Sequence, residues 1–131
     1  PGEPFKPLKA IASSGEMARV MLALKTVLAT QDSIPILVFD EVDSNLGGET
    51  AGVVGKKMKQ IGGNRQVLCI THLAPVAAAG HRHYLVSKEV VEGRTLTRVT
   101  QLDGESRVEE LTRMLGGGGA AARQHAEELL S

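Results

Sequence analysis

Two acidic residues at the end of a short apolar run are the first candidates for chemistry in this sequence. The run ILVF at residues 36–39 leads directly into Asp40 and Glu41. Such a run predicts a strand buried on both faces of a parallel sheet, and ligands bind at the carboxyl edge of such sheets. In phosphoryl-transfer ATPases an Asp there holds Mg²⁺ and a neighbouring acid orients the attacking water. A strand that simply ends at exposed acids has the same pattern, so the pattern alone does not establish catalysis.

The segment IASSGE at residues 11–16 is a second candidate, because it directly precedes a predicted helix. Small residues let a backbone approach a phosphate closely, and the N-terminus of a helix presents unsatisfied N–H groups to it. Ser13 and Glu16 are also spaced as an ordinary capping box. On its own, the segment favours capping over phosphate binding.

A third candidate is His72, which follows Thr71 at the end of another apolar run, QVLCIT. A histidine there could donate a hydrogen bond to a γ-phosphate or transfer a proton, although a single histidine at a strand end is more often structural. His81 and His83 follow, but no Cys or acidic residue lies at the spacings typical of zinc sites. A metal centre built on these histidines is therefore not favoured.

The elements that must position these residues alternate between helix and strand. Apolar residues recur at helical spacing over about residues 15–29. Residues 49–61 form a second predicted helix, and Gly62 and Gly63 predict the left-handed conformation that ends many helices. The two strands, at 36–39 and 66–71, lie on either side of the second helix in sequence. A right-handed parallel crossover is therefore the preferred geometry.

The remainder of the chain has a different pattern. The runs HYLVSKEVV and RTLTRVTQL, joined at Glu92-Gly93, predict a β-hairpin. Ser106 with Glu109 predicts a capping box in front of a helix, VEELTRML, and four glycines separate it from a last helix, AAARQHAEELL. The opening PGEPFKPLKA is rich in proline and predicts an extended lead-in.

Composition excludes several classes of protein. The 131 residues include 42% apolar and 23% charged residues, which is typical of a folded globular chain. No apolar stretch approaches the roughly 18 residues that span a bilayer, so no membrane partner is expected. The single cysteine, Cys69, cannot form an internal disulfide, which fits a reducing, intracellular compartment, and we expect it to be a buried small hydrophobe. The formal net charge of zero argues against a globally basic nucleic-acid-binding surface, although a local basic patch or a partner segment could still bind DNA.

Along the chain the candidates follow one another as IASSGE, then Asp40 and Glu41, then Ser44-Asn45-Leu46, then His72, and this order is more specific than any one of them. In that order they resemble the carboxyl-terminal lobe of an ABC-type ATPase head. ASSGE resembles the signature motif, ILVFDE the Walker B motif, SNL the D-loop and ITH the switch-histidine loop. The stretches MARVMLALK, VFDEVD, QVLCITHLAPVAA and RVEELTRMLGG extend the resemblance to the SMC-like family of bacterial DNA repair ATPases. The implied fold class is α/β, a lobe of an ABC/SMC-type P-loop ATPase head.

The resemblance implies roles for the acids and the histidine. Asp40 would help to hold Mg²⁺ through water, Glu41 would polarise the attacking water, and His72 would sense the γ-phosphate of ATP. Glu41 and His72 are therefore the expected catalytic residues.

The resemblance also implies contacts with a second head. Ser13, Ser14 and Gly15 would contact the γ-phosphate of ATP bound to the opposite head, and Asn45 would lie at the head–head interface. Two positions depart from the usual motifs. Ser14 stands where the signature has its first glycine, which adds a side chain at a close phosphate approach, and Gly47 stands where many D-loops have aspartate.

No G-x-x-x-x-G-K-[ST] motif occurs in the chain: the nearest match, TAGVVGKK, has Thr50 for the first glycine and Lys57 for Ser/Thr. The resemblance implies that the Walker A motif comes from an amino-terminal lobe of the same protein, beyond a long coiled coil. We therefore expect one carboxyl-terminal half-head over residues 1–131. Residues 1–12 would form a lead-in, residues 13–83 a core that holds the motifs, and residues 84–131 the hairpin and terminal helices.

The function implied is an ATP-binding and ATP-hydrolysing head lobe that acts in DNA double-strand break repair and recombination through ATP-dependent head dimerisation. Its partners would be the Walker A lobe, a second head in a homodimer, and DNA, in the bacterial cytoplasm at the nucleoid. A lone half-head should leave a sheet edge unpaired and apolar surface uncovered.

An ABC transporter ATPase subunit is one alternative function, and VFDEVD in place of a transporter-like DEPT favours the repair protein. A non-catalytic interaction module is another, supported by Ser14.

Overall fold

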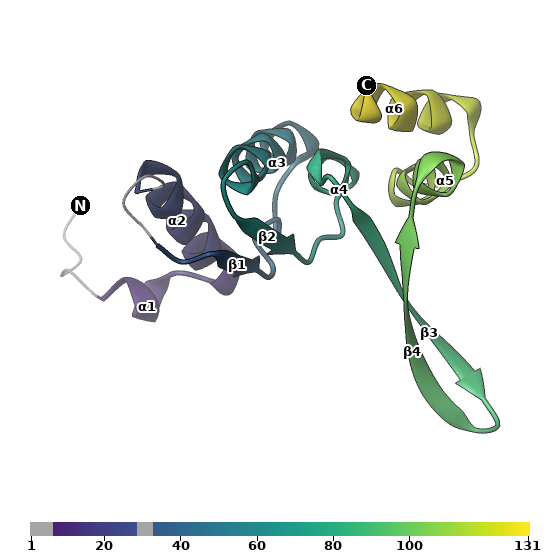
Figure 1. Ribbon diagram of the computed structural model, residues 1–131, viewed down its shortest axis with the longest axis horizontal. Coiled ribbons are helices and arrows are strands. Elements are labelled where there is room, and N and C mark those ends of the chain that lie inside the picture. Colours follow the sequence, from purple (N-terminus) through teal and green to yellow (C-terminus); the bar gives the residue numbers. More distant parts are fainter. Residues whose placement is uncertain (1–6, 29–32) are drawn as a thin grey trace.

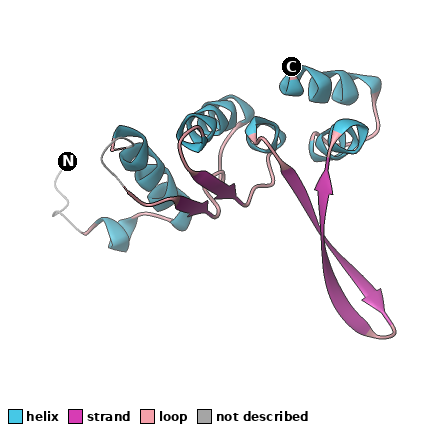
Figure 2. Cartoon of the chain, in the orientation of Figure 1, coloured by secondary structure: helices cyan, strands magenta, loops and turns pink. Residues whose placement is uncertain are grey.

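The structure is a computed structural model that describes residues 7–28 and 33–131 of the chain. Figure 1 shows a row of helices and short strands from which a long hairpin projects. The elements are α1 (Leu8–Ile11), α2 (Ser14–Val27), β1 (Ile36–Phe39), α3 (Gly48–Gly62), β2 (Gln66–Cys69), α4 (Ala74–Ala79), β3 (His83–Val91), β4 (Arg94–Leu102), α5 (Gly104–Met114) and α6 (Ala120–Leu130). The α/β class is confirmed, with a parallel sheet, an antiparallel hairpin and carboxyl-terminal helices (Figure 2).

The parallel pairing of the two short strands is also confirmed. Ile36 of β1 lies opposite Gln66 of β2, and Phe39 lies opposite Cys69. Because the strands are parallel and in this register, both end at the same edge of the sheet. The residues that follow each strand, Asp40 in one case and Ile70 in the other, therefore start from neighbouring positions.

The prediction that β1 is buried on both faces is wrong. Leu37 and Phe39 are buried, whereas Ile36 and Val38 are 51% and 64% exposed. The buried face packs against side chains of α2, α3 and α4, such as Leu22. In the described part of the chain no element covers the other face, so its apolar side chains meet solvent.

The main core lies between the sheet and the helices above it. Its buried residues are Leu22, Leu37, Phe39, Val42, Ala51, Val54, Met58, Ile61 and Val76. A second, smaller cluster joins α4 to the two terminal helices, with Ala74, Ala77, Ala78, Leu111 and Ala126 at its centre. The helix α4 therefore belongs to both clusters and connects the sheet to the terminal helices.

Helix ends agree with the sequence in part. The Ser13 and Glu16 capping box is present at the start of α2, and the predicted end of that helix, Ala29, lies outside the described residues. The expected left-handed stop of α3 is wrong, because Gly63 has a right-handed φ of −64°. Its N–H donates instead to the carbonyl groups of Gln60 and Ile61, which closes the last turn.

The hairpin is confirmed, and its turn has positive φ at both Glu92 (50°) and Gly93 (75°). These are the signs required by a two-residue turn that matches the twist of the strands. The capping box of α5 is predicted wrongly: Asp103, and not Ser106, is the cap, and Ser106 is its partner three residues later. The helix therefore begins earlier than its apolar run suggests.

Two short helical segments were not predicted from the sequence. α1 forms a turn of helix in the expected extended lead-in, because Pro7 precedes the turn and its carbonyl accepts from the Ala10 N–H at 2.8 Å. α4 is too short for a periodic pattern, although Pro75 in its first turn is a helix-start signal. No helix within the two described ranges has the length and apolar character to cross a membrane.

Candidate functional site

The carboxyl edge of the parallel sheet gathers three of the predicted residues. Asp40 and Glu41 follow β1, while His72 lies three positions beyond the end of β2. Asp40, Glu41 and His72 are all exposed. Strand pairing brings the two loops together, because the N–H of Ile70 donates to the carbonyl of Phe39 at 2.9 Å.

The N-terminus of α2 contacts the loop after β1 directly. The hydroxyl of Ser14 donates a hydrogen bond to Oε2 of Glu41. Ser13 is the cap of the helix: its hydroxyl accepts from the Glu16 N–H, and the Glu16 carboxylate accepts from the Ser13 N–H at 2.8 Å. The Ser13 hydroxyl also donates to the Glu16 carboxylate at 2.8 Å. The two hydrogen bonds that the carboxylate accepts, led by that from the Ser13 backbone, lower the pKa of Glu16 below its ordinary value. The predicted signature and Walker B residues are therefore in contact within one chain.

Gly15 is buried where α2 and this loop pack most closely. A Cβ atom at this position would lie 1.9 Å from Oγ of Ser44 and 2.8 Å from the carbonyl oxygen of Glu41. Arg19, one turn later, donates to the carbonyl oxygens of Val42 at 3.2 Å and Ser44 at 3.0 Å. The glycine is thus required by contacts inside the chain, which is a different reason from the phosphate approach that its motif suggests.

The loop between β1 and α3 has an unusual backbone. Glu41 and Asn45 have positive φ angles of 57° and 60°, which few residues other than glycine adopt. Such conformations persist only where surrounding contacts hold them, and they concentrate at functional sites. The N–H of Ser44 donates to the Glu41 carbonyl at 3.0 Å, and Arg19 supplies the contacts described above. Asn45 is exposed at the end of this turn.

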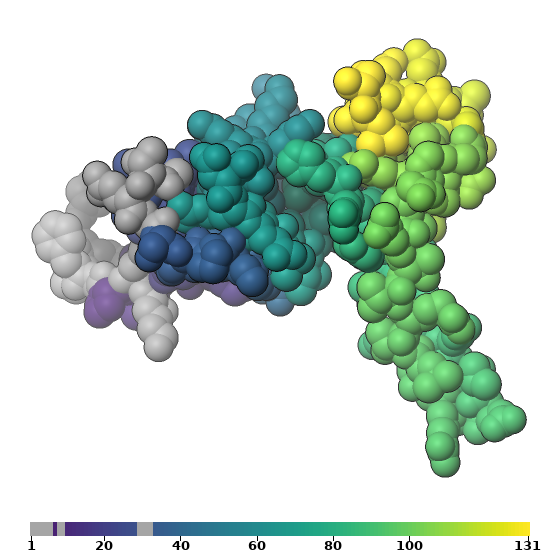
Figure 3. Space-filling model, viewed as in Figure 1, coloured from purple at the N-terminus to yellow at the C-terminus, as the bar shows by residue number. Residues whose placement is uncertain are grey.

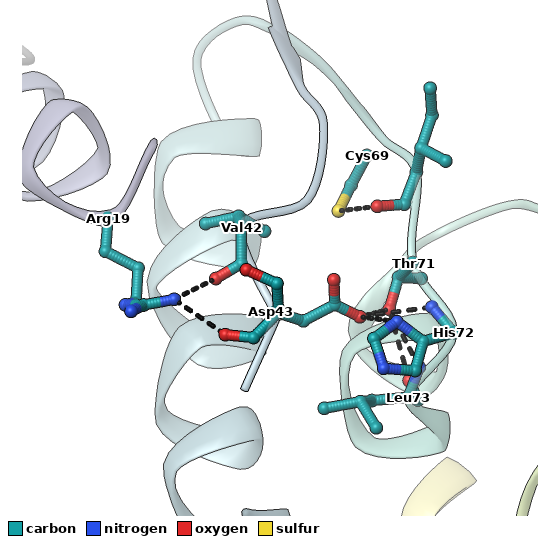
Figure 4. Close-up of polar contacts among 9 residues, drawn as sticks. Arg19, Val42, Asp43, Cys69, Thr71, His72 and Leu73 are labelled. Atoms are coloured by element: carbon teal, nitrogen blue, oxygen red, sulfur yellow. Dashed lines mark hydrogen bonds and ion pairs between the residues drawn. The ribbon is translucent and has the colours of Figure 1, made fainter. Parts of the chain in front are cut away.

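Asp43 is a residue of this site that sequence analysis missed. It is only 1% exposed and faces the segment after β2 (Figure 4). Its Oδ2 atom accepts a hydrogen bond from the Thr71 hydroxyl and one from the His72 N–H at 3.1 Å, and lies 3.4 Å from Nδ1 of His72. The third acid of DEVD is the only available sequence signal, and it gives no indication of burial.

Cys69 is the last residue of β2 and lies opposite Phe39, the residue before Asp40. It is half-buried, and its thiol donates to the Ile70 carbonyl at 3.7 Å. Burial raises the pKa of the thiol to about 12, and the nearby carboxylates of Asp43 and Asp40 contribute in the same direction. A thiol that stays protonated is a poor nucleophile, so Cys69 is a structural residue.

The donor set suits Mg²⁺ better than a transition metal. Within the described ranges, no three His, Cys, Asp or Glu side chains converge as metal ligands, and His81 and His83 form no such group. Mg²⁺ keeps several waters and is held by one or two carboxylates together with substrate phosphates. The exposed carboxylate of Asp40 fits that requirement.

Comparison with known proteins shows extensive similarity to RecN. The chain is 48% identical to the DNA repair protein RecN of Xylella fastidiosa over 126 residues, which cover 96% of this chain and 23% of that protein. It is 48% identical to RecN of Deinococcus radiodurans over 132 residues, which cover 100% and 23%. It is 42% identical to RecN of Bacillus subtilis over 131 residues, which cover 98% and 23%. The chain thus spans about a quarter of the length of these relatives, and no protein-family model matches it.

Two solved structures share the fold. One comes from work on ATP-driven dimerisation and DNA-stimulated activation of SMC ATPases, with a TM-score of 0.58 and 22% identity over 90% of this chain and 70% of that chain. The other is the SMC head domain from Thermotoga maritima, with a TM-score of 0.54 and 30% identity over 79% of this chain and 38% of that chain. The chain therefore resembles RecN in sequence along nearly its whole length, and it has the fold of an SMC ATPase head.

Proposed function

We propose that this chain is the carboxyl-terminal lobe of the ATPase head of an SMC-like DNA repair protein. The head hydrolyses ATP only when an amino-terminal Walker A lobe and a second head complete the site. One observation carries the proposal: segments that are distant in sequence meet at one edge of the sheet, where Ser14 contacts Glu41 and Asp43 contacts His72. The similarity to RecN proteins supports the role in DNA repair, and favours it over a transporter subunit.

The side chains at this edge have separate tasks in the proposed reaction. Asp40 holds Mg²⁺ through water, and that ion neutralises charge on the phosphates when it is bound. Glu41 accepts a hydrogen bond from the attacking water and orients it, which positions the nucleophile in line with the γ-phosphate. His72 meets the γ-phosphate from the neighbouring loop. In this arrangement the acids and the histidine approach the phosphates from one edge of the sheet.

The N-terminus of α2 serves the opposite head. When two heads close around ATP, this N-terminus meets the γ-phosphate of the opposite head through Ser13, Ser14 and Gly15. The exposed Asn45 meets the surface of the second head. In the isolated chain the Ser14 hydroxyl occupies Oε2 of Glu41. Glu41 must therefore release Ser14, or share that oxygen, before it can orient water. The same contact is the observation that favours a non-catalytic module, which would bind ATP without turnover.

The surface of the chain supports completion by another lobe. Among the described residues β1 and β2 pair only with each other, so the sheet has open edges. Ile36, Val38, Leu68 and Ile70 expose apolar side chains on or beside its uncovered face. Val38, Leu68 and Ile70 also line a groove of about 1000 Å³ that continues to Tyr84 and Val86 of the hairpin. We propose that the remainder of the head packs here, and that residues 13–83 and 84–131 act together as one half-head after the lead-in at 1–12.

A chimeric protein tests this proposal. RecN of Deinococcus radiodurans would carry this chain in place of the segment that it matches, and steady-state ATP hydrolysis would be compared with that of the isolated chain. The proposal expects ATP hydrolysis by the chimera and none by the isolated chain, which lacks a Walker A motif. DNA repair is tested separately, by whether the chimera restores resistance to double-strand breaks in cells that lack their own RecN.

Two results would contradict the proposal. Hydrolysis by the isolated chain would show that the site is complete without another lobe. A folded chimera that binds ATP but never hydrolyses it, beside an active parent RecN, would favour the non-catalytic module.

A further inference from the structure

A buried carboxylate connects the two loops of the proposed site. Asp43 lies in the same loop as Glu41, and its Oδ2 atom meets three groups of the opposite loop. These are the hydroxyl of Thr71, the backbone N–H of His72 and the ring nitrogen Nδ1 of His72, 28 or 29 residues away in sequence. A buried charge is costly unless hydrogen bonds compensate for it, so these contacts fix where the carboxylate can lie.

The backbone that carries Asp43 is itself held in place. Arg19 donates to the carbonyl groups on both sides of it, that of Val42 (Figure 4) and that of Ser44. The N–H of Leu46 donates to the carbonyl of Asp43 at 3.2 Å. Both the carboxylate and its backbone are therefore fixed before any ligand binds.

One nitrogen of the His72 ring faces Asp43, and most of the side chain is exposed. Its Nδ1 lies 3.4 Å from Oδ2 of Asp43, and the side chain as a whole is 69% exposed. A neutral imidazole carries one proton, on one of its two nitrogens, and the hydrogen-bond partner of one nitrogen determines the state of the other. A carboxylate can only accept a hydrogen bond, so an Oδ2 atom 3.4 Å from Nδ1 favours the tautomer that carries its proton on Nδ1.

We propose that Asp43 is a positioning residue for His72. It holds Nδ1–H of the ring toward the carboxylate and thereby presents Nε2 to the space where the γ-phosphate binds in the proposed function. Nε2 is the acceptor in the neutral ring and becomes a second donor when the ring is protonated, so it can donate to a phosphate oxygen only in that state. The identity of the group that Nε2 meets rests on the proposed function. The orientation of the ring rests only on the contact between His72 and Asp43.

The orientation is tested in the isolated chain by nitrogen NMR of the imidazole rings, at a pH where they are neutral. We expect His72 to be mainly the Nδ1–H tautomer, whereas the exposed His81 serves as an internal reference for a solvated ring. In Asp43→Asn the side chain keeps its size and one oxygen acceptor but no longer attracts Nδ1–H with a full charge, so His72 should shift toward the tautomer ratio of His81. Thr112→Val is the matched control, because it removes another half-buried threonine hydroxyl, one that donates to the Val108 carbonyl at 2.8 Å within α5, and should leave the His72 tautomer unchanged.

The consequence for the reaction is tested in the RecN chimera. Asp43→Asn should lower kcat by about tenfold or more, a part of what a positioned proton donor or acceptor contributes, with little change in KM for ATP. Thr112→Val should leave kcat unchanged.

The outcomes separate this inference from the proposed function. An inactive chimera would count against the function, while the tautomer of His72 would still decide the role of Asp43. A wild-type His72 with the same tautomer ratio as His81 overturns the inference, even where Asp43→Asn does not fold. Equal losses of kcat in Asp43→Asn and Thr112→Val would overturn it too, because they would show that the loss in Asp43→Asn reflects general stability and not the orientation of His72.

Discussion

Gly15 shows how a residue in a ligand-binding motif can be required by its own chain. A Cβ there would collide with the side chain of Ser44 and with the carbonyl oxygen of Glu41, 2.8 Å away, and backbone atoms cannot move aside easily. We expect Gly15→Ala to lower the free energy of unfolding by about 1–3 kcal/mol, as overpacking usually does. Urea denaturation of the chain measures this change.

The same substitution at Gly52 is the control. Gly52 lies in α3, and a Cβ there would meet nothing within 4 Å. Gly52→Ala should therefore raise the free energy of unfolding by about 0.5–1 kcal/mol through helix propensity. Equal effects of the two substitutions would contradict the close contact between α2 and the loop.

Cys69 gives a prediction that depends on pH. Its folded-state pKa of about 12 lies above the ordinary value of 9.0. At pH 8 the fraction of thiolate should be about 1000-fold lower than in the unfolded chain, and alkylation by iodoacetamide should slow accordingly. Comparing alkylation rates in buffer and in denaturant measures this, and equal rates would contradict it.

The sign of the effect on stability follows from the same shift. The folded state disfavours the thiolate, so the contribution of Cys69 to stability is fully present below pH 9.0 and is lost as pH rises from there toward 12. Cys69→Ser should reduce this loss at alkaline pH, because serine does not ionise in that range.

Individual residues were predictable from sequence where their neighbours in the chain determine them. The capping role of Ser13 depends on Glu16, three residues away, and was predicted. Asp43 was missed because its burial depends on Thr71, 28 residues away, and on how Arg19 holds the loop. The contact between Ser14 and Glu41 was missed for the same reason, since it requires the packing of α2 beside the sheet.

At the scale of elements, the hairpin is the least supported part of the fold. Every residue of β4 except Leu102 is exposed, and β3 and β4 pair only with each other in the described structure. Figure 3 shows the hairpin standing away from the rest of the chain. A two-stranded sheet without other contacts is at best marginally stable in water.

Hydrogen exchange tests this difference between elements. Amides near the hairpin tip, between Val90 and Thr95, should exchange at least about 100-fold faster than those of Val54 and Met58 in α3, because local opening suffices to expose them. Uniform protection of the hairpin and α3 in the isolated chain would contradict this expectation. In the RecN chimera, slower exchange of the hairpin would indicate that the added lobe covers it.

The order and type of most elements could be predicted from sequence, and their ends less well. Apolar runs and periodicity are local, so β1, β2, the hairpin and the longer helices were predicted. The start of α5 at Gly104 and the end of α3 at Gly62 depend on which hydrogen bonds close each end. The exposure of Val38 could not be predicted from a continuous apolar run, because it depends on what covers the sheet.

At the scale of the whole molecule, the uncovered sheet face separates the isolated chain from the completed head. Val38 is 64% exposed on this face, so Val38→Asp should change the free energy of unfolding of the isolated chain by less than about 1 kcal/mol. In the RecN chimera the same aspartate would be buried without a partner, and should lower stability by about 2–4 kcal/mol. Thermal unfolding of both proteins measures the contrast.

Val53→Asp is the matched control for the charge and the size change. Val53 is 56% exposed on α3, the helix whose buried residues share the core with Leu37 and Phe39 on the covered face of the sheet. Val53→Asp should change the free energy of unfolding of the isolated chain and of the chimera by the same amount. A loss of stability in the chimera that is the same for both valines would contradict packing of another lobe on the uncovered sheet face.

The most direct test of the central claim is ATP hydrolysis by the RecN chimera that carries Glu41→Gln, measured beside ATP binding. The amide keeps the size of the side chain but lacks the negative charge with which Glu41 polarises and orients the attacking water. We expect hydrolysis to fall by at least about 100-fold while ATP still binds. Glu49→Gln, an equal change at an exposed position in the first turn of α3, should leave hydrolysis unchanged. Undiminished hydrolysis by Glu41→Gln would contradict the account, because the acid at the edge of the sheet would then have no part in the reaction.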